Sequence, residues 1–153
     1  MRGGGRGEQG HDQGSGLEQD DAAAVVLLRQ AASQGLVRAQ FNLGLMYEIG
    51  RGVAQDDRQA IEWYRQAAQK GDVDAQYVMG TFYASGRGIA RDDQQAAYGF
   101  RMAAARGDAE AHVYLAEMAL QGRIAAASDR EAALLKQARV ASGPKPQYEV
   151  LEP

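Results

Sequence analysis

Residues 35–70 read GLVRAQFNLGLMYEIGRGVAQDDRQAIEWYRQAAQK, and residues 71–106 read GDVDAQYVMGTFYASGRGIARDDQQAAYGFRMAAAR. Roughly half of the positions are identical when the two segments are aligned, and Gly35, Gly71 and Gly107 recur at a spacing of 36 residues. A period of this length is typical of repeat proteins, in which each copy forms one supersecondary unit and neighbouring units stack. The sequence therefore predicts a repeat architecture.

Each copy predicts two helices. In the first copy, Leu43 and Tyr47 lie on one face of an expected first helix, and Ala60 and Tyr64 lie on one face of an expected second helix. Asp56 precedes the second helix, where a carboxylate accepts hydrogen bonds from the free amides of the first turn. The unit is therefore an antiparallel helical hairpin, and the fold class is an all-α solenoid.

The register also extends toward the N-terminus. Several glycines, aspartates and alanines of the first copy have the same residue 36 positions earlier in the chain. These earlier residues are Gly14, Gly16, Asp20, Asp21, Ala24, Ala31 and Ala32. We expect the ordered chain to begin inside a repeat, with a second helix from about Asp21 to Ser33. Two explanations stay open: a degraded terminal cap, or the downstream part of a longer array.

The third copy departs from the pattern. Lys136 and Arg139 stand at positions that are apolar in the other second helices, which favours a solvent-facing cap. In the second copy, Gly99 replaces the tryptophan of the first and predicts a looser second helix. The predicted segments are 1–16, a Gly-rich disordered lead; 17–34, a partial repeat with its second helix only; 35–70 and 71–106, two full repeats; 107–141, a degenerate capping repeat; and 142–153, a disordered tail.

At these positions the chain resembles a known family, the Sel1-like repeat, a relative of the tetratricopeptide repeat with a longer loop between its helices. The resemblance covers about residues 14–141 and implies a right-handed superhelix whose first helices line a concave, protein-binding surface. In the first copy it is carried by Ala39, Leu43, Gly44, Tyr47, Gly50, Gly52, Val53, Asp56, Ala60, Trp63, Tyr64, Ala67, Ala68 and Gly71.

Composition excludes several classes of function. The net charge of −3 gives no electrostatic footprint for nucleic acid or an anionic membrane, and the chain has no cysteine for a disulfide or a thiolate metal site. No apolar run approaches the length of a membrane span, and no signal peptide is visible. We therefore expect no cofactor, no nucleic acid partner and no membrane insertion, and a cytoplasmic location for the sequence as given.

The sequence does not assemble a catalytic or metal site. His11 and His112 lie far apart, and neither has a partner at metal-ligand spacing. The GRG loops lack the lysine and hydroxyl that complete a phosphate-binding loop, and the paired aspartates recur with the repeat, which indicates helix caps. The chain is therefore not expected to be an enzyme.

The variable face of each first helix is the predicted partner-binding surface. Its residues follow helical spacing and form one stripe per helix, with apolar anchors between charged side chains. Its members are Arg38, Phe41, Leu45 and Glu48, then Asp74, Tyr77 and Thr81, then Glu110, Val113 and Glu117. Asn42, Val78 and Tyr114 can belong to this stripe or pack against the next repeat.

The favoured function is a noncatalytic adaptor or scaffold that binds a peptide or partner helix on the concave face, with possible self-association through the open N-terminal helix. The first alternative is β-lactam binding or hydrolysis, which is credited to cysteine-rich relatives. The second is RNA binding, suggested by the arginine-glycine lead of residues 2–7. Residues 17–142 carry more acidic than basic side chains, so the array lacks the positive groove that RNA requires.

Overall fold

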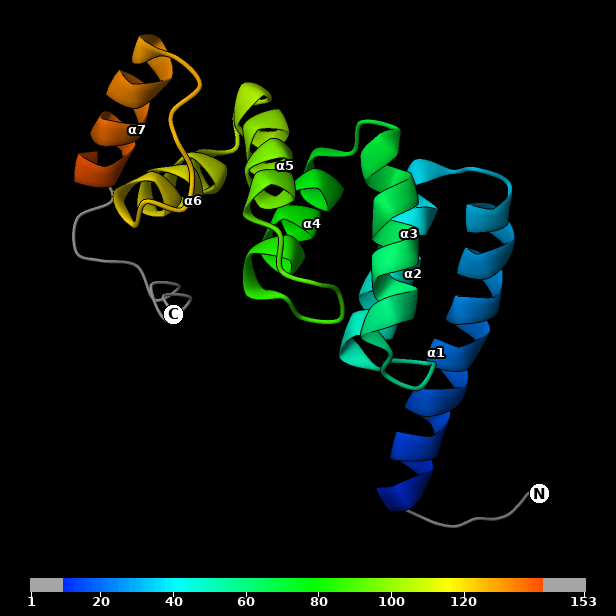
Figure 1. The fold of residues 1–153 in the computed structure, drawn as a ribbon. Coiled ribbons are helices and arrows are strands. Elements are labelled where there is room, and N and C mark those ends of the chain that lie inside the picture. Colours follow the sequence, from blue (N-terminus) through cyan, green and yellow to red (C-terminus); the bar gives the residue numbers. More distant parts are fainter. Residues whose placement is uncertain (1–9, 142–153) are drawn as a thin grey trace. The chain divides into compact units, whose positions relative to one another are not determined.

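The computed structural model describes residues 10–141, which contain seven α-helices and no strand (Figure 1). Successive helices are joined by short connections and pair as antiparallel hairpins, which confirms the predicted all-α repeat fold. The predicted tail of residues 142–153 lies outside the described residues. The helices are α1 (Gly10–Ser33), α2 (Val37–Ile49), α3 (Asp57–Gln69), α4 (Val73–Ser85), α5 (Asp93–Ala105), α6 (Ala109–Leu120) and α7 (Asp129–Ala141).

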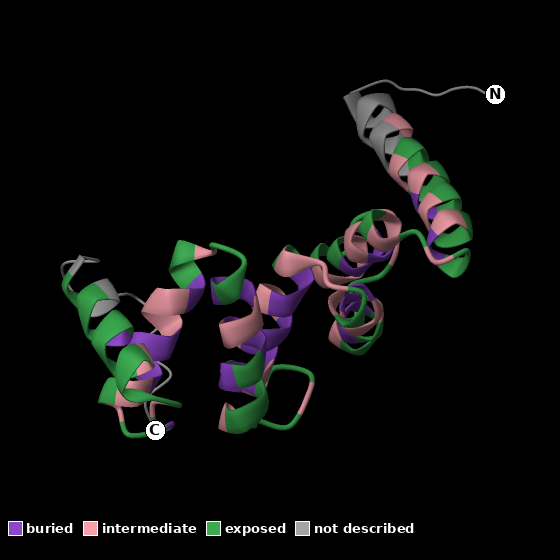
Figure 2. Cartoon of the chain, turned by 90° about the horizontal axis from the view of Figure 1, so that it is seen from above, coloured by how far each residue is buried: buried purple, intermediate pink, exposed green. Residues whose placement is uncertain are grey.

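The chain divides into two compact units, Met1–Ala67 and Ala68–Pro153. The first holds α1, α2 and most of α3, with Val25, Ala32 and Leu43 at the centre of its core. The second holds the α4–α5 and α6–α7 hairpins, and its larger core is rich in alanine. Figure 2 shows the buried residues as narrow bands on the sides of the helices, which is the pattern of amphipathic helices in a thin repeat.

α1 begins earlier than expected. It starts at Gly10, so the predicted start near Asp21 is wrong, and the predicted disordered lead overlaps the helix over residues 10–16. The segment before Asp21 contains no proline, and a helix that is already nucleated extends by one backbone hydrogen bond per added residue. Residues 1–9 lie outside the described part of the chain.

The first aspartate of each pair in the full repeats caps the second helix, as predicted. Asp56 accepts hydrogen bonds from the amides of Arg58 and Gln59, and Asp92 caps α5 in the same way. At the other end, Gly71 and Gly107 adopt φ angles of 94° and 97°, which only glycine reaches without strain. These local signals therefore fix the limits of the second helices.

In two of the three aspartate pairs, the second aspartate forms an ion pair instead, whereas Asp57 accepts a 2.8 Å hydrogen bond from Gln55 Nε2. Asp21 accepts from Arg51 Nε at 3.0 Å, and Asp93 accepts from Arg123 Nε at 3.1 Å. In both cases the arginine comes from the interhelical loop of the next hairpin. Asp21 therefore does not cap a helix, because α1 runs through it.

Glycines allow close contact between the paired helices. A Cβ at Gly44 would lie 2.9 Å from the ring of Tyr64, and a Cβ at Gly80 would lie 2.7 Å from the ring of Phe100. A Cβ at Gly99 would lie 2.8 Å from the carbonyl oxygen of Gln76 on α4. The prediction that Gly99 loosens its helix is therefore wrong, because its missing side chain lets the α5 backbone approach α4.

The ion pairs of the second unit predict acid sensitivity. A hydrogen bond from Arg123 lowers the pKa of Asp93 from its ordinary value of 3.8, and a hydrogen bond from Arg101 lowers the pKa of Glu131 from 4.5. As pH falls, the two carboxylates take up protons in the unfolded state before they do so in the folded state. The ion pairs therefore stabilise the fold fully above the ordinary pKa values, and this stabilisation is lost as pH falls through the lower pKa values of the folded state. The free energy of unfolding should therefore fall between about pH 5 and about pH 2.

Urea unfolding at a series of pH values measures this effect. In the double variant Asp93→Asn/Glu131→Gln, the loss of stability over the same acid range should be smaller. Parallel stability curves for the variant and the wild type would contradict the assignment of these two carboxylates.

Candidate interaction surfaces

In the first unit, α2 presents an aromatic side chain beside a charged one. Phe41 is half-buried, and its ring packs against the ring of Tyr64, with 5.3 Å between the two centroids. The guanidinium of Arg38 lies over the Phe41 ring, 4.5 Å from the ring centroid. Leu45 is 36% exposed one turn further along, and Glu48 accepts a 2.7 Å hydrogen bond from the Tyr64 hydroxyl. Phe41 and Leu45 thus form a small apolar surface between two charges.

In the second unit, α4, α5 and α6 each contribute one ring to a cluster of three aromatic side chains. Tyr77 is half-buried, with its ring centroid 5.9 Å from Phe100 and 5.7 Å from Tyr114. Phe100 and Tyr114 stack at 4.8 Å, and Phe100 is fully buried. Tyr114 therefore packs against the preceding hairpin, which was one of the two options left open by the sequence.

Acidic groups surround this aromatic cluster. Burial raises the pKa of Tyr77, and the neighbouring Tyr114, Glu110 and Asp108 raise it further. Burial likewise raises the pKa of Tyr114. Both hydroxyls therefore stay protonated at neutral pH, and the two side chains are hydrogen-bonded to each other. Asp74 is exposed one turn before Tyr77 on α4, so this face combines aromatic surface with negative charge.

The rest of the predicted stripe divides into accessible and inaccessible residues. Thr81 and Val113 are partly exposed, and Glu110 is exposed. Glu117 is only 3% exposed, so its assignment to the binding surface is wrong. All positions from Leu115 to Met118 are buried, and this part of α6 is enclosed on every side, which helical spacing alone cannot reveal.

Sequence reasoning missed a recurring internal contact. Gln40 and Gln76 are buried, and their Nε2 atoms donate to the backbone oxygens of Ala32 and Ala68 at 3.1 and 3.3 Å. Each carbonyl, near the end of the preceding second helix, also accepts from a backbone amide, that of Gly35 or Gly71, so the glutamine adds a second hydrogen bond to it. The signal was present as an Ala-Gln dipeptide that recurs with the repeat, followed by His112 at the third position.

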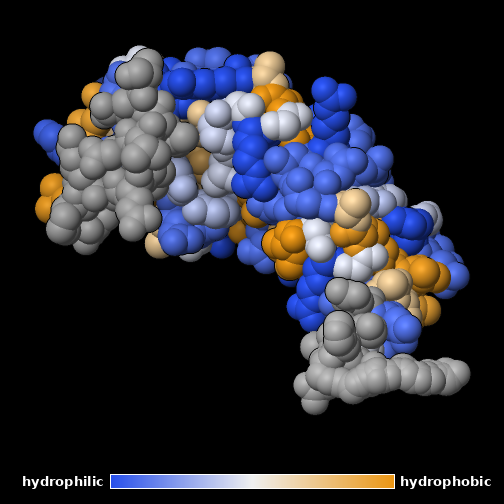
Figure 3. Space-filling view, turned by 90° about the horizontal axis from the view of Figure 1, so that it is seen from below, coloured by the Kyte–Doolittle hydropathy of each residue, from blue (hydrophilic) through white to orange (hydrophobic). Residues whose placement is uncertain are grey.

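Exposed apolar side chains are scattered over the described helices. On the face drawn in Figure 3, hydrophobic residues lie in small groups between hydrophilic ones. On α1, Val26 and Leu27 are 53% and 66% exposed. Leu135, at the position of α7 equivalent to Leu27, is only 4% exposed because α7 is paired with α6. The Leu27 position is therefore covered in the third hairpin, whereas Leu134, the equivalent of Val26, stays 43% exposed there.

No group of three or more histidine, cysteine or acidic side chains could hold a metal ion within residues 10–141. In that same part of the chain, no helix combines the length and the apolar character that a membrane crossing needs.

Antiparallel helical hairpins that recur every 36 residues define the class of helical-repeat proteins. The chain belongs to the Sel1 repeat family, whose model matches residues 6–36, 37–72 and 73–108. Its members are generally protein-interaction modules and typically noncatalytic scaffolds. The helices α6 and α7 lie wholly beyond the matched residues, and the first match begins inside the predicted lead.

Solved structures show the same fold. A protective antigen of uropathogenic Escherichia coli strains is 32% identical, with a TM-score of 0.70, over 78% of this chain and 26% of its own length. A Sel1 repeat protein from Oxalobacter formigenes is 31% identical, with a TM-score of 0.70, over 80% of this chain and 51% of its own.

Cysteine-rich protein B of Helicobacter pylori is 28% identical, with a TM-score of 0.54, over 57% of this chain and 65% of its own. No curated protein matches the sequence. The chain thus spans about a quarter of the Escherichia coli antigen and about half of the Oxalobacter formigenes protein. Unlike the cysteine-rich Helicobacter pylori protein, it contains no cysteine.

Proposed function

We propose that this chain is a noncatalytic protein-interaction module whose partner binds along the exposed faces of the first helices. The observation that carries the proposal is the recurrence of Phe41 and Tyr77 at equivalent positions. Each ring is half-exposed and is held from below by an aromatic side chain of the second helix, Tyr64 or Phe100. Rigid, partly exposed aromatic side chains are the residues that most often dominate binding energy in protein interfaces.

The charges beside these rings specify the partner further. Arg38 accompanies Phe41 in the first unit, whereas Asp74 and Glu110 accompany Tyr77 in the second. An acidic partner side chain would therefore suit the α2 face of the first unit, and a basic one would suit the α4–α6 face of the second. A basic side chain also gains from contact with the face of a tyrosine ring.

Replacement of Phe41 and Tyr77 by serine should abolish partner binding and leave the helix content unchanged. The measurement is affinity capture from the native lysate, with helicity checked by circular dichroism. Single hot-spot aromatic residues contribute about 2 kcal/mol or more, so loss of both should lower affinity by about a thousandfold.

Tyr98→Ser is the matched control, because Tyr98 is 63% exposed on the second helix α5. The control should retain the same partner as the wild type. Equal capture by the control and by the Phe41→Ser/Tyr77→Ser variant would contradict the proposed surface. Self-association through Val26 and Leu27 of α1 stays a prediction.

A further inference from the structure

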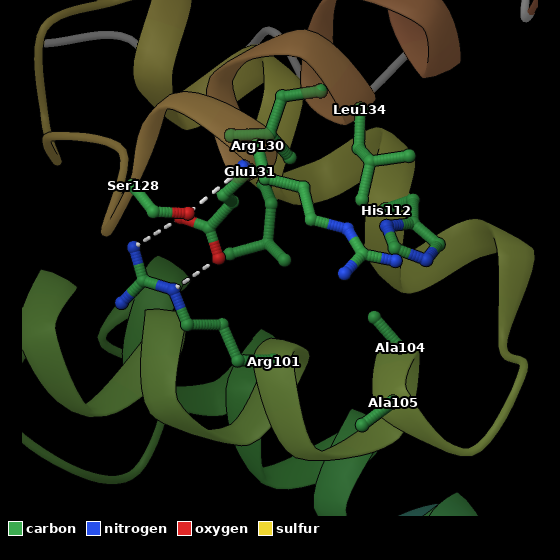
Figure 4. Close-up of a pocket in the computed structure, with 10 residues that line it drawn as sticks. Arg101, Ala104, Ala105, His112, Ser128, Arg130, Glu131 and Leu134 are labelled. Carbon is green, nitrogen blue, oxygen red and sulfur yellow. Dashed lines mark hydrogen bonds and ion pairs between the residues drawn. The ribbon is translucent and has the colours of Figure 1, made fainter.

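The second unit contains a cavity of about 370 Å³ that the proposed function does not use (Figure 4). It lies between α5, α6 and the start of α7. Its volume falls within the usual range for small-ligand sites, about 300–1,000 Å³. The apolar part of its lining is formed by Ala104, Ala105, Leu115, Leu134 and Leu135, and the polar part by Arg101, His112, Ser128, Arg130 and Glu131.

His112 occupies the repeat position of Gln40 and Gln76. Those glutamines are buried and donate to a helix carbonyl, so their amides are engaged. His112 is partly exposed and lines the cavity; it interacts with Glu131 through charge, and no hydrogen bond to another described residue engages its ring. The third hairpin thus presents a ring N–H donor where the other hairpins have an internal contact.

The side chains that line the cavity include two arginines and one glutamate, which leaves an excess of positive charge. Arg101 is occupied, because its Nε and Nη2 each donate to Glu131 at 2.9 Å. Arg130 is exposed at the same cavity, and within the described residues no hydrogen bond or ion pair engages its guanidinium. Figure 4 shows Arg130 and His112 extending together on the side away from the Arg101–Glu131 pair. One positive charge is therefore available to a ligand.

A replacement in the third hairpin removes negative charge nearby. The residue before the second helix is Asp56 or Asp92 in the full repeats and Ser128 here. The Ser128 hydroxyl accepts a 3.1 Å hydrogen bond from the Glu131 amide, so it performs the capping role without a carboxylate. An anion in the cavity therefore meets no repulsion from this position.

We propose that this cavity binds the free carboxyl terminus of a protein that ends in an aliphatic residue. Arg130 and His112 hold the carboxylate by charge-assisted hydrogen bonds, and Leu115, Leu134 and Leu135 contact the aliphatic side chain. A carboxylate fits better than a phosphate, because a largely apolar lining with one available guanidinium compensates one negative charge but not two. The inference rests on the proposed function only in that the ligand belongs to a protein.

The test titrates the full chain with an N-acetylated tripeptide that ends in leucine, as the free acid and as the C-terminal amide, by calorimetry. The free acid should bind at least about tenfold more tightly than the amide, because the amide cannot form the charge-assisted contacts. His112→Gln restores the residue of the other repeats, and Arg130→Gln introduces the residue found at Gln94. Each should weaken binding of the acid by about tenfold.

Arg58→Gln is the matched control, since Arg58 holds the same repeat position in the first unit, and it should bind the acid as the wild type does. Equal binding of acid and amide, no binding of either, or unchanged binding by Arg130→Gln would overturn the proposal. Binding of N-acetylglycine as tight as that of the tripeptide would also overturn it, because the site would then take any small carboxylate without using the leucine side chain.

The two proposals fail separately. If the tripeptide does not bind while capture of a partner still depends on Tyr77, the cavity assignment fails and the first-helix surface stands. If the tripeptide binds equally to wild type and Tyr77→Ser while no capture depends on Tyr77, the surface assignment fails and the cavity stands.

Discussion

Phe100→Ala should destabilise the second unit by about 3–5 kcal/mol, the typical cost of removing a large buried aromatic side chain. Phe100 is fully buried, packs on Gly80 and stacks on Tyr114. Its loss leaves a cavity at the centre of the aromatic cluster, because the helix backbones cannot close around it without losing their own packing. Urea unfolding followed by circular dichroism measures the effect.

Tyr98→Ala provides the control on the same helix. Tyr98 is 63% exposed, and its replacement should change the free energy of unfolding by less than about 1 kcal/mol. Equal destabilisation by the two variants would contradict the description of the core. The Phe100→Ala variant should also weaken partner binding, because Tyr77 loses the ring that supports it.

Arg123→Met should destabilise the second unit by about 2–3 kcal/mol. The side chain of Arg123 is only 6% exposed, and it donates to Asp93 and, at 2.9 Å, to the backbone oxygen of Ala84. Methionine keeps much of the aliphatic stem but removes the donor that both acceptors share, and Asp93 then keeps only the longer ion pair with Arg91 at 3.6 Å. Thermal and urea unfolding both measure the loss.

Arg51→Met removes the equivalent ion pair of the first unit, in which the arginine is exposed to solvent. Arg51 and Arg123 hold equivalent repeat positions, but the Arg51 side chain is 59% exposed beside Asp21. Water can replace the arginine there, so this variant should unfold almost as the wild type does. A larger loss for Arg51→Met than for Arg123→Met would contradict the role assigned to burial.

Most of the fold could be predicted from the sequence because the pattern is local and is written more than once. Asp56 and Asp92 identify helix starts, and Gly71 and Gly107 identify helix ends, through the chemistry of single residues. The start of α1 could not be predicted this way, because its first turns carry no cap signal. Gly99 was misread because its helix propensity says nothing of the neighbouring backbone.

The candidate site was predictable in part. Helical spacing placed Phe41 and Tyr77 on the outer faces of the first helices, where they are half-exposed. It failed for Glu117, because exposure near the end of α6 depends on how the surrounding helices enclose it. The cavity beside His112 was missed, since it arises where α5, α6 and α7 meet and no single segment encodes it.

Site-specific photo-crosslinking tests the central claim most directly. A photoreactive amino acid is placed at Leu45 or Thr81 on the first helices, or at the exposed Gln59 or Gln95 on the second helices as controls. In the native lysate, the account predicts that positions 45 and 81 crosslink to one partner protein and that positions 59 and 95 do not. Crosslinking of that protein from positions 59 and 95 alone would contradict a binding surface on the first helices.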